Sequence, residues 1–429
     1  MALLLKGGRV VDPAMGLDAV LDIVVRDGVI VEVGEDLTIP KGETIDCAEK
    51  VVLPGLADVH VHLREPGREY KETIASGTRA AAHGGFTAVA CMPNTDPVCD
   101  SGSKVRFIVE RAAAEGAVRV YPIGAITKRQ EGEQLAEIGD MIAEGAVAFS
   151  DDGKGIQSAG MTRVAMDYIK RFGAPMIAHC EDESLAENGV VNEGVVSTRM
   201  GLPGIPDVAE ETMVARDIAL AELTGCRLHL AHLSTAGSLE LVRAAKARGV
   251  KVTCEVTPHH LFLDEDALVG YDTNLKMNPP LRTAADREAL VAGLLEGTVD
   301  CIATDHAPHA VHEKELEFEL APFGTTGLET ALSLVNTHLV ATGKMTWSQV
   351  AQLMCHGPRE AVGLPAMRLE AGMPADITIV DPEARVEVTA EWFASKGRNS
   401  AFLGANLLGK ASDVLVGGKW ALKNGKVAG

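Results

Sequence analysis

Two histidines and an arginine alternate in the stretch DVHVHLREPG, which runs from Asp58 to Gly67. His60 and His62 are two residues apart, and Arg64 continues the same spacing. Side chains at alternate positions of a β-strand point to the same face, so a strand here would turn both imidazoles to one side. Imidazole is a common metal ligand, and the guanidinium of arginine matches a carboxylate. The stretch indicates a metal site beside an anion-binding group, although Arg64 without these neighbours would be interpreted as a surface salt-bridge residue.

Further groups that bind metals follow other apolar stretches of the chain. His179 and His232 supply two more imidazoles, and Asp305 supplies a carboxylate. Imidazoles and carboxylates without cysteine suit catalytic Zn²⁺. Together with His60 and His62 these ligands exceed one tetrahedral site, and they suit two ions if an anion bridges them. A bridged pair would hold a hydroxide with a pKa lowered toward neutral, which is a nucleophile.

Eight apolar runs in the middle of the chain are the elements that must position these groups. They cover residues 51–61, 86–92, 118–126, 145–150, 174–180, 226–233, 250–256 and 299–305. Amphipathic stretches lie between most of them, such as residues 235–249, where Gly249 is expected to end a helix. Eight strand–helix units predict an α/β fold, a (β/α)₈ TIM-like barrel. An open doubly wound sheet is the alternative, and the lack of G-x-G-x-x-G after the first run counts modestly against its dinucleotide-binding form.

Polar residues gather where the apolar runs end. The runs end in HVHLR, CMPNTD, FSDDGK, AHCED, AHLS, VTPHH and ATDHAPH. The C-terminal ends of barrel strands meet at one face, which is where barrel enzymes carry their active sites. A lone histidine in an apolar run, such as His83 or His229, is expected to be a hydrogen-bonded core residue. Many acids and imidazoles at one rim instead indicate a site, because burying them without a metal or substrate would leave polar groups unpaired.

The two ends of the chain resemble each other and differ from the middle. Residues 20–34 form two β-rich runs around Asp27-Gly28, and residues 413–429 repeat the pattern around Asn424-Gly425. Both dipeptides are typical of tight β-hairpins. We expect the ends to combine into one small β-sandwich domain, with residues 1–54 and 366–429 flanking a metal-binding barrel of residues 55–365.

Composition limits the partners and the compartment. The 429 residues carry a net charge of −20, which argues against nucleic acid or an anionic membrane surface as a partner. No apolar run approaches the roughly 20 residues that span a bilayer, and the N-terminus lacks a signal-peptide pattern. The eight cysteines are scattered and form no C-x-x-C pair. These features predict a cytoplasmic protein with reduced, buried thiols.

The chain contains four short segments whose joint occurrence is typical of a single protein family: HVHLREPG, MPNTDP, NPPLR and DHAPH. With a histidine after the fifth run and another after the sixth, the chain resembles the dihydroorotases of the bacterial class I type, within the metal-dependent cyclic amidohydrolases. The resemblance covers nearly the whole chain. It implies one or two Zn²⁺ ions, with two favoured, on these ligands: His60, His62, His179, His232 and Asp305.

The resemblance also implies which group bridges the two ions. Many relatives use a carboxylated lysine after the fourth strand, where this chain has FSDDGKG. In class I dihydroorotases the second aspartate takes that place, which implies a bridge of Asp152 and a hydroxide. Asp151 is the main alternative, because spacing alone does not separate adjacent aspartates. Lys154 is a weaker one.

The activity implied is reversible hydrolysis of L-dihydroorotate to N-carbamoyl-L-aspartate, which runs as cyclisation in pyrimidine synthesis. The bridging hydroxide would attack the ring amide, and Asp305 would shuttle the proton to the leaving nitrogen. The resemblance implies contacts to the carboxylate, the ring and the pyrimidine edge from His62, Arg64, Asn94, Asn278, His309, Phe323 and Gly324. The charged segment between His309 and Gly324 is expected to be a mobile loop that could cover the substrate, or else a short solvated helix.

Other functions remain as alternatives to this one. A sister amidohydrolase acting on hydantoins, dihydropyrimidines or allantoin would generally carry the bridging lysine and lack the Arg64 and Asn94 pair. A non-catalytic scaffold for aspartate transcarbamoylase would typically have lost metal ligands, and this chain retains the set. A homodimer is expected, and association with aspartate transcarbamoylase is an open possibility.

Overall fold

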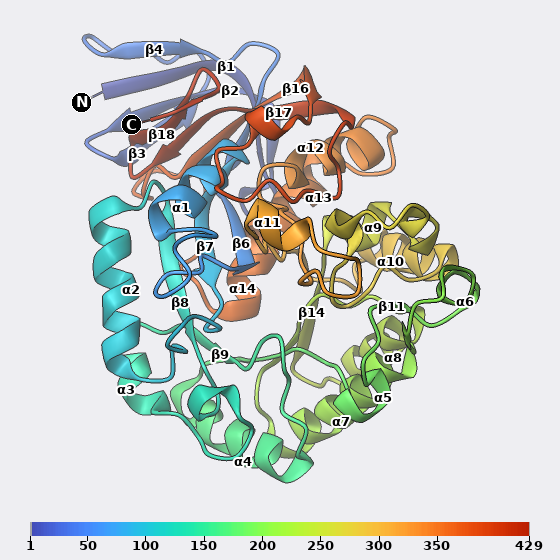
Figure 1. Cartoon of the computed structure of the whole chain (residues 1–429). Helices are drawn as coiled ribbons and strands as arrows, with labels where there is room; N and C mark the ends of the chain where they lie inside the picture. The colour runs from blue at the N-terminus through green and yellow to red at the C-terminus, as the bar shows by residue number, and fades with distance from the viewer. Residues whose placement is uncertain (1, 429) are drawn as a thin grey trace.

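Eight parallel strands form a barrel in the computed structural model, which describes residues 2–428 (Figure 1). The hydrogen-bonded order is β15-β14-β13-β10-β9-β8-β7-β6. The barrel closes where the His62 amide donates to the His306 carbonyl at 2.9 Å, beside a bridge between Val61 and His306. The predicted (β/α)₈ fold is confirmed, since each of the eight predicted runs contains one barrel strand; the first run also contains β5 of the sheet beside the barrel. The strands are β6 Leu56–Val61, β7 Phe86–Cys91, β8 Arg119–Gly124, β9 Ala148–Ser150, β10 Met176–Ala178, β13 Leu228–Leu230, β14 Val252–Val256 and β15 Cys301–Ile302.

Helices surround the barrel, and several of them begin at a side chain that accepts from a free amide of the first turn. The Thr235 hydroxyl accepts from the Ser238 amide at the start of the predicted helix near residues 235–249, and Gly249 follows its end with a φ of +80°. Thr283 and Asp286 form a capping box at the start of the next long helix. The helices are α1 Ile74–His83, α2 Gly102–Glu115, α3 Ile138–Ala143, α4 Ala159–Ile169, α5 Glu183–Ala186, α6 Val195–Met200, α7 Val208–Thr224, α8 Ala236–Ala247, α9 Pro258–Phe262, α10 Ala284–Glu296, α11 Val311–Lys314, α12 Ala331–Val335, α13 Trp347–Ala351 and α14 Gly357–Val362.

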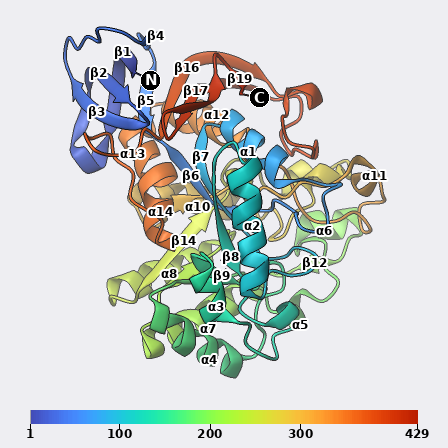
Figure 2. The ribbon, with the colours of Figure 1, turned by 90° about the vertical axis from the view of Figure 1, so that its left-hand side faces the viewer.

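Both ends of the chain enter one nine-stranded sheet beside the barrel, as Figure 2 shows from the side. Its order is β19-β18-β17-β16-β5-β1-β2-β3, and β4 pairs with β1. The antiparallel pairing of β16 with β5 joins the two ends. The strands are β1 Ala2–Asp12, β2 Leu17–Arg26, β3 Val29–Gly34, β4 Glu43–Asp46, β5 Val51–Pro54, β16 Ile377–Glu387, β17 Asn406–Val416, β18 Lys419–Lys423 and β19 Lys426–Val427.

The two predicted hairpins turn at the predicted dipeptides. Asp27 and Gly28 have φ values of +51° and +85° between β2 and β3, and Asn424 and Gly425 have +51° and +71° between β18 and β19. Two successive residues with positive φ are what a type I′ turn requires, and asparagine, aspartate and glycine tolerate it best. The expectation that both ends share one β unit agrees with this sheet.

The nine-stranded sheet has its own apolar core and a polar link to the barrel. Residues such as Leu3, Ile23 and Ile377 pack together with almost no exposed surface. Arg119 of β8 donates to both carboxylate oxygens of Asp376 at 2.6 and 2.9 Å. The connection between β10 and β13 contains a separate small sheet, in which β11 (Val191–Asn192) pairs with β12 (Gly204–Ile205) in parallel. Within residues 2–428, every helix is too short or too polar to cross a bilayer.

Candidate active site

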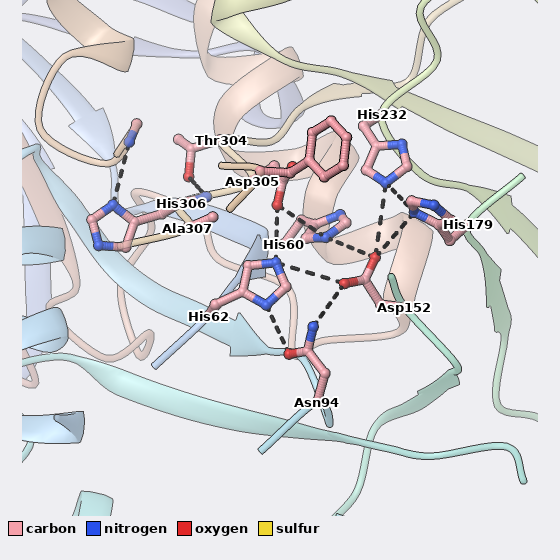
Figure 3. Close-up of polar contacts among 12 residues, drawn as sticks. His60, His62, Asn94, Asp152, His179, His232, Thr304, Asp305, His306 and Ala307 are labelled. Carbon is pink, nitrogen blue, oxygen red and sulfur yellow. Dashed lines mark hydrogen bonds and ion pairs between the residues drawn. The ribbon is translucent and has the colours of Figure 1, made fainter. Parts of the chain in front are cut away.

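A pocket opens at the C-terminal ends of the barrel strands, and its lining contains most of the predicted site residues. His60 alone among them is missing from the lining, because its side chain lies fully buried beneath the pocket. Figure 3 shows the histidines and carboxylates converging from different strands. The predicted residues in the lining are His62, Arg64, Asn94, Asp152, His179, His232, Asn278, Asp305, His309, Phe323 and Gly324.

Asp152 lies at the centre of the histidines (Figure 3). Its Oδ1 is 3.3 Å from His60 Nε2, 3.6 Å from His179 Nδ1 and 3.8 Å from His232 Nε2. Its Oδ2 is 3.6 Å from His62 Nε2. One carboxylate therefore faces all four imidazoles, which is the arrangement that a group shared by two cations requires.

Asp151 points away from this cluster. Its Oδ1 accepts from the Ile126 amide at 2.8 Å and the Thr127 amide at 3.1 Å, and its Oδ2 accepts from the Thr127 hydroxyl. These bonds tie the end of β9 to the loop after β8. With its acceptors engaged in that loop, Asp151 is turned away from the histidines that surround Asp152.

Asp305 completes the cluster from the end of β15. Its Oδ1 lies 2.9 Å from His62 Nε2 and 3.5 Å from His60 Nε2. Its φ is +47°, and Arg64 and His232 also adopt positive φ values of +61° and +34°. Non-glycine residues in this region are strained, and such strain gathers at functional sites.

The donor set fits divalent metal ions. Three overlapping groups have ligand atoms within 4.8 Å of one another: His60–His62–Asp152, Asp152–His179–His232 and His60–His232–Asp305. Buried His60 Nε2 has no hydrogen-bond partner among residues 2–428, although it faces both carboxylates. This unpaired nitrogen lies among imidazole nitrogens and carboxylate oxygens, without a thiol. Such a donor set matches a site for a borderline-hard cation such as Zn²⁺.

Charge in the cluster also favours a cation. Burial would raise the pKa of Asp152, but attraction to His60 and hydrogen bonds from His179 and His232 hold it well below its ordinary value. Burial opposes ionisation of Asp305 as well, but attraction to His60, contact with His62 and attraction to His232 lower its pKa. Both carboxylates are therefore ionised at neutral pH, and two buried negative charges require positive partners.

A second set of groups forms the other wall of the pocket. Arg64 is 7 % exposed, and its Nε donates to the Pro308 carbonyl at 3.3 Å while its Nη2 lies 3.5 Å from His309 Nε2. Asn94 contacts both halves of the site, since its Oδ1 lies 2.8 Å from His62 Nδ1 and its Nδ2 donates to Asp152 at 3.3 Å. Buried Asn278 Oδ1 has no partner among residues 2–428. An arginine and unpaired polar groups beside the metal ligands are suited to an anionic, polar ligand.

Lys71 is a charged residue outside the pocket lining that contacts His309 of this wall, and the sequence interpretation did not single it out. It is 6 % exposed, and its Nζ lies 3.1 Å from His309 Nδ1 and 2.8 Å from Glu313 Oε1. Because an ammonium only donates, it makes Nδ1 the acceptor and leaves the proton of neutral His309 on Nε2, which lies 2.8 Å from the Phe323 carbonyl. The sequence could have pointed to Lys71 only through its position in REPGREYKE, which continues the segment that begins at Asp58.

The segment between His309 and Gly324, whose ends line the pocket, is anchored by two lysines, Lys276 and Lys314, which we call the lysine clamp. Lys314 Nζ donates to the Thr273 and Pro322 carbonyls, both at 2.8 Å. In return, Lys276 Nζ donates to the Phe318 and Glu319 carbonyls, both at 2.9 Å. Burial lowers the pKa of Lys314 to about 7 and that of Lys276 to about 8. The segment contains the short helix α11, in which Val311 and His312 are exposed and Lys314 is buried, so the helix expected as an alternative is present and partly solvated.

Comparison with known proteins gives matches over the full chain. A family model described as dihydro-orotase-like matches residues 49–238. Dihydroorotase of Pelotomaculum thermopropionicum is 54 % identical over 99 % of both chains, and that of Acetivibrio thermocellus is 52 % identical over 97 % of this chain and 98 % of its own. Among solved structures, an L-hydantoinase (dihydropyrimidinase) from Arthrobacter aurescens is 25 % identical with a TM-score of 0.89, covering 100 % of this chain and 97 % of its own. A D-hydantoinase from a Thermus species is also 25 % identical, with a TM-score of 0.86, and covers 100 % and 96 % respectively.

Proposed function

The chain belongs to the dihydroorotase family, and from this premise we propose that it catalyses the reversible hydrolysis of L-dihydroorotate to N-carbamoyl-L-aspartate, with cyclisation as its direction in pyrimidine synthesis. The observation that best supports this substrate is the position of Arg64, a buried cation in the same pocket as the metal-binding cluster. Dihydroorotate has a ring amide, which requires the metal-binding cluster, and a carboxylate, which requires a cation such as Arg64. A hydantoin without a carboxylate would leave the Arg64 charge unpaired.

We propose one or two Zn²⁺ ions, with two favoured, held by His60, His62, His179, His232 and Asp305. The central position of Asp152 supports it as the shared ligand, and the bonds that Asp151 makes elsewhere support its exclusion. When bound, zinc polarises a carbonyl oxygen and lowers the pKa of water, which is the activation that amide hydrolysis needs at neutral pH.

Asp305 is the proposed proton carrier. Its carboxylate lines the pocket, and its lowered pKa keeps it ionised before reaction, so it can accept a proton from the attacking water. In hydrolysis the same oxygen then delivers that proton to the leaving ring nitrogen. In cyclisation Asp305 takes the proton from the ureido nitrogen and returns it to the departing water.

Substrate binding is assigned to the second wall. The guanidinium of Arg64, with Asn94 and His309, is proposed to hold the carboxylate. Asn278 and the main chain at Phe323 and Gly324 are proposed to hold the pyrimidine edge, and His62 to contact the substrate as well as the metal. The unpaired Asn278 oxygen supports this assignment, since a ring N–H would satisfy it.

Cyclisation of N-carbamoyl-L-aspartate by zinc-loaded protein tests the proposal. We expect turnover with this substrate and its reversal with L-dihydroorotate, and at most weak turnover with hydantoin or dihydrouracil. Faster turnover of the uncharged rings would assign the chain to the hydantoinase-like activity instead. A protein without any turnover that binds aspartate transcarbamoylase would support the scaffold role.

We further propose a cytoplasmic homodimer. All eight cysteines are free and buried, which supports a reducing compartment. The resemblance to class I dihydroorotases supports the dimer and leaves association with aspartate transcarbamoylase possible. Sedimentation of the protein alone and mixed with aspartate transcarbamoylase measures both associations.

A further inference from the structure

Glu255 is a carboxylate buried inside the barrel wall directly below the metal-binding cluster. It lies on β14, and its side chain has no exposed surface. Its Oε1 lies 2.6 Å from His60 Nδ1 and accepts from the His232 amide at 3.2 Å. The residue therefore contacts two proposed metal ligands that come from β6 and from the end of β13, although the pocket lining does not include it.

The contact with His60 decides which nitrogen of that imidazole is free. A carboxylate accepts, so the short contact places the proton of neutral His60 on Nδ1. Nε2 then keeps its lone pair and faces Asp152 and Asp305, at 3.3 and 3.5 Å. Metal binding needs that lone pair, and a carboxylate on the opposite nitrogen also raises the basicity of the ligand.

The other oxygen of Glu255 is fixed by a residue with no metal contact of its own. Glu255 Oε2 lies 3.0 Å from His229 Nε2, and His229 Nδ1 lies 2.8 Å from the Thr253 hydroxyl. His229 is thus the hydrogen-bonded core residue that the sequence predicted. Because both oxygens are engaged, the carboxylate cannot rotate away from His60.

We propose that Glu255 is a positioning residue that sets the metal affinity of the site by fixing the His60 tautomer and its orientation, and the place of His232. This inference rests on the proposed metal site and is independent of which cyclic amide the enzyme hydrolyses. His229 belongs to the same chain of contacts, since it holds the carboxylate from the far side.

The variant Glu255→Gln, compared with Glu329→Gln, tests the proposal by zinc affinity in competition with a chelator. The glutamine side chain keeps the shape but loses the charge, and we expect zinc affinity to fall about 10- to 100-fold. Glu329 is a matched control, because it is 3 % exposed and its Oε1 lies 2.8 Å from His83 Nδ1, a histidine outside the metal cluster. Its variant is expected to bind zinc as the wild type does. Unchanged affinity in Glu255→Gln, or an equal loss in both variants, would overturn the proposal.

Two further measurements separate positioning from a merely structural role. The absorption spectrum of the cobalt-substituted protein is expected to change in Glu255→Gln and to stay unchanged in Glu329→Gln; an unchanged spectrum in both contradicts the proposal. Should Glu255→Gln not fold, His229→Gln frees one oxygen of the carboxylate while leaving its charge: a fall in zinc affinity supports the proposal and wild-type affinity overturns it. Because affinity is read without substrate, these results stand even if the wild type does not cyclise N-carbamoyl-L-aspartate.

Discussion

Asp305 both contacts the histidine cluster and lines the pocket, so in the proposed reaction it is the residue where binding and chemistry would meet. The sequence predicted it from its place at the end of the eighth run. What the sequence could not separate was Asp151 from Asp152, because the choice depends on which aspartate bonds to the loop at residues 126–127. The role of Glu255 could not be predicted either. It is a single carboxylate in the run KVTCEV, and nothing near it in the sequence indicates its contact with His60.

Replacement of Asp305 by asparagine keeps the volume and removes the base. We expect kcat to fall by about 10²- to 10⁴-fold, the usual contribution of a general acid–base group. Steady-state cyclisation assays measure the loss, and metal analysis of the same sample shows whether zinc remains bound. Wild-type kcat in a zinc-loaded variant would refute the proton-carrier role.

Replacement of Arg64 by lysine keeps the charge and removes the planar fork. A charge-assisted hydrogen bond is worth about 1.5–3 kcal/mol, so KM for N-carbamoyl-L-aspartate is expected to rise by about 10- to 100-fold. Arg79→Lys on α1 is the control, because Arg79 is exposed and outside the pocket lining. A KM that changes equally little in both variants would remove Arg64 from the carboxylate site.

Among the elements, the barrel strands and the long helices were predictable, and the short elements inside the strand–helix connections were not. Each of the eight barrel strands lies in an apolar run, and seven of these runs end in polar residues, so the type of every strand and the end of most were visible. The strands β11 and β12 have two residues each, and α11 has four, too few for a periodic pattern. The lysine clamp could not be foreseen, because Lys276 and Lys314 each bind carbonyl oxygens of the other's segment, and carbonyls carry no sequence signal.

The lysine clamp predicts the behaviour of the segment between His309 and Gly324. In Lys314→Met three donated hydrogen bonds are lost, those to the carbonyls of Thr273, Lys276 and Pro322. We expect faster amide hydrogen exchange across residues 310–322 and a higher KM, with exchange elsewhere in the barrel unchanged. Lys344→Met is the control, because Lys344 is exposed and far along the chain from the segment. Equal exchange in wild type and Lys314→Met would show that the clamp does not hold the segment.

At the scale of the whole molecule, the proposed metal ligands come from the ends of five barrel strands, β6, β9, β10, β13 and β15. The barrel itself was predictable, since eight strand–helix repeats leave few other closed arrangements. The sequence predicted that the two chain ends share one β domain, but not that β16 pairs with β5. The alternation within a strand does not specify its neighbour in the sheet.

Metal removal is expected to destabilise the entire barrel. A ligand that binds only the folded state adds about 4 kcal/mol when its concentration is about 1,000 times its Kd. The melting temperature should therefore fall by several degrees on chelation and recover when zinc is added back. In Asp152→Asn the zinc-dependent shift is expected to shrink. A melting temperature that does not respond to chelator or zinc would contradict the metal site.

The strand β5 ends at Pro54, and its partner β16 begins only at Ile377. A ribosome adds about 5–20 residues per second, so the edge of β5 waits tens of seconds for its neighbour while the barrel emerges. An unpaired edge is a template for pairing with other chains. The β5 edge of the nascent polypeptide is therefore open to pairing with other chains throughout synthesis of the barrel.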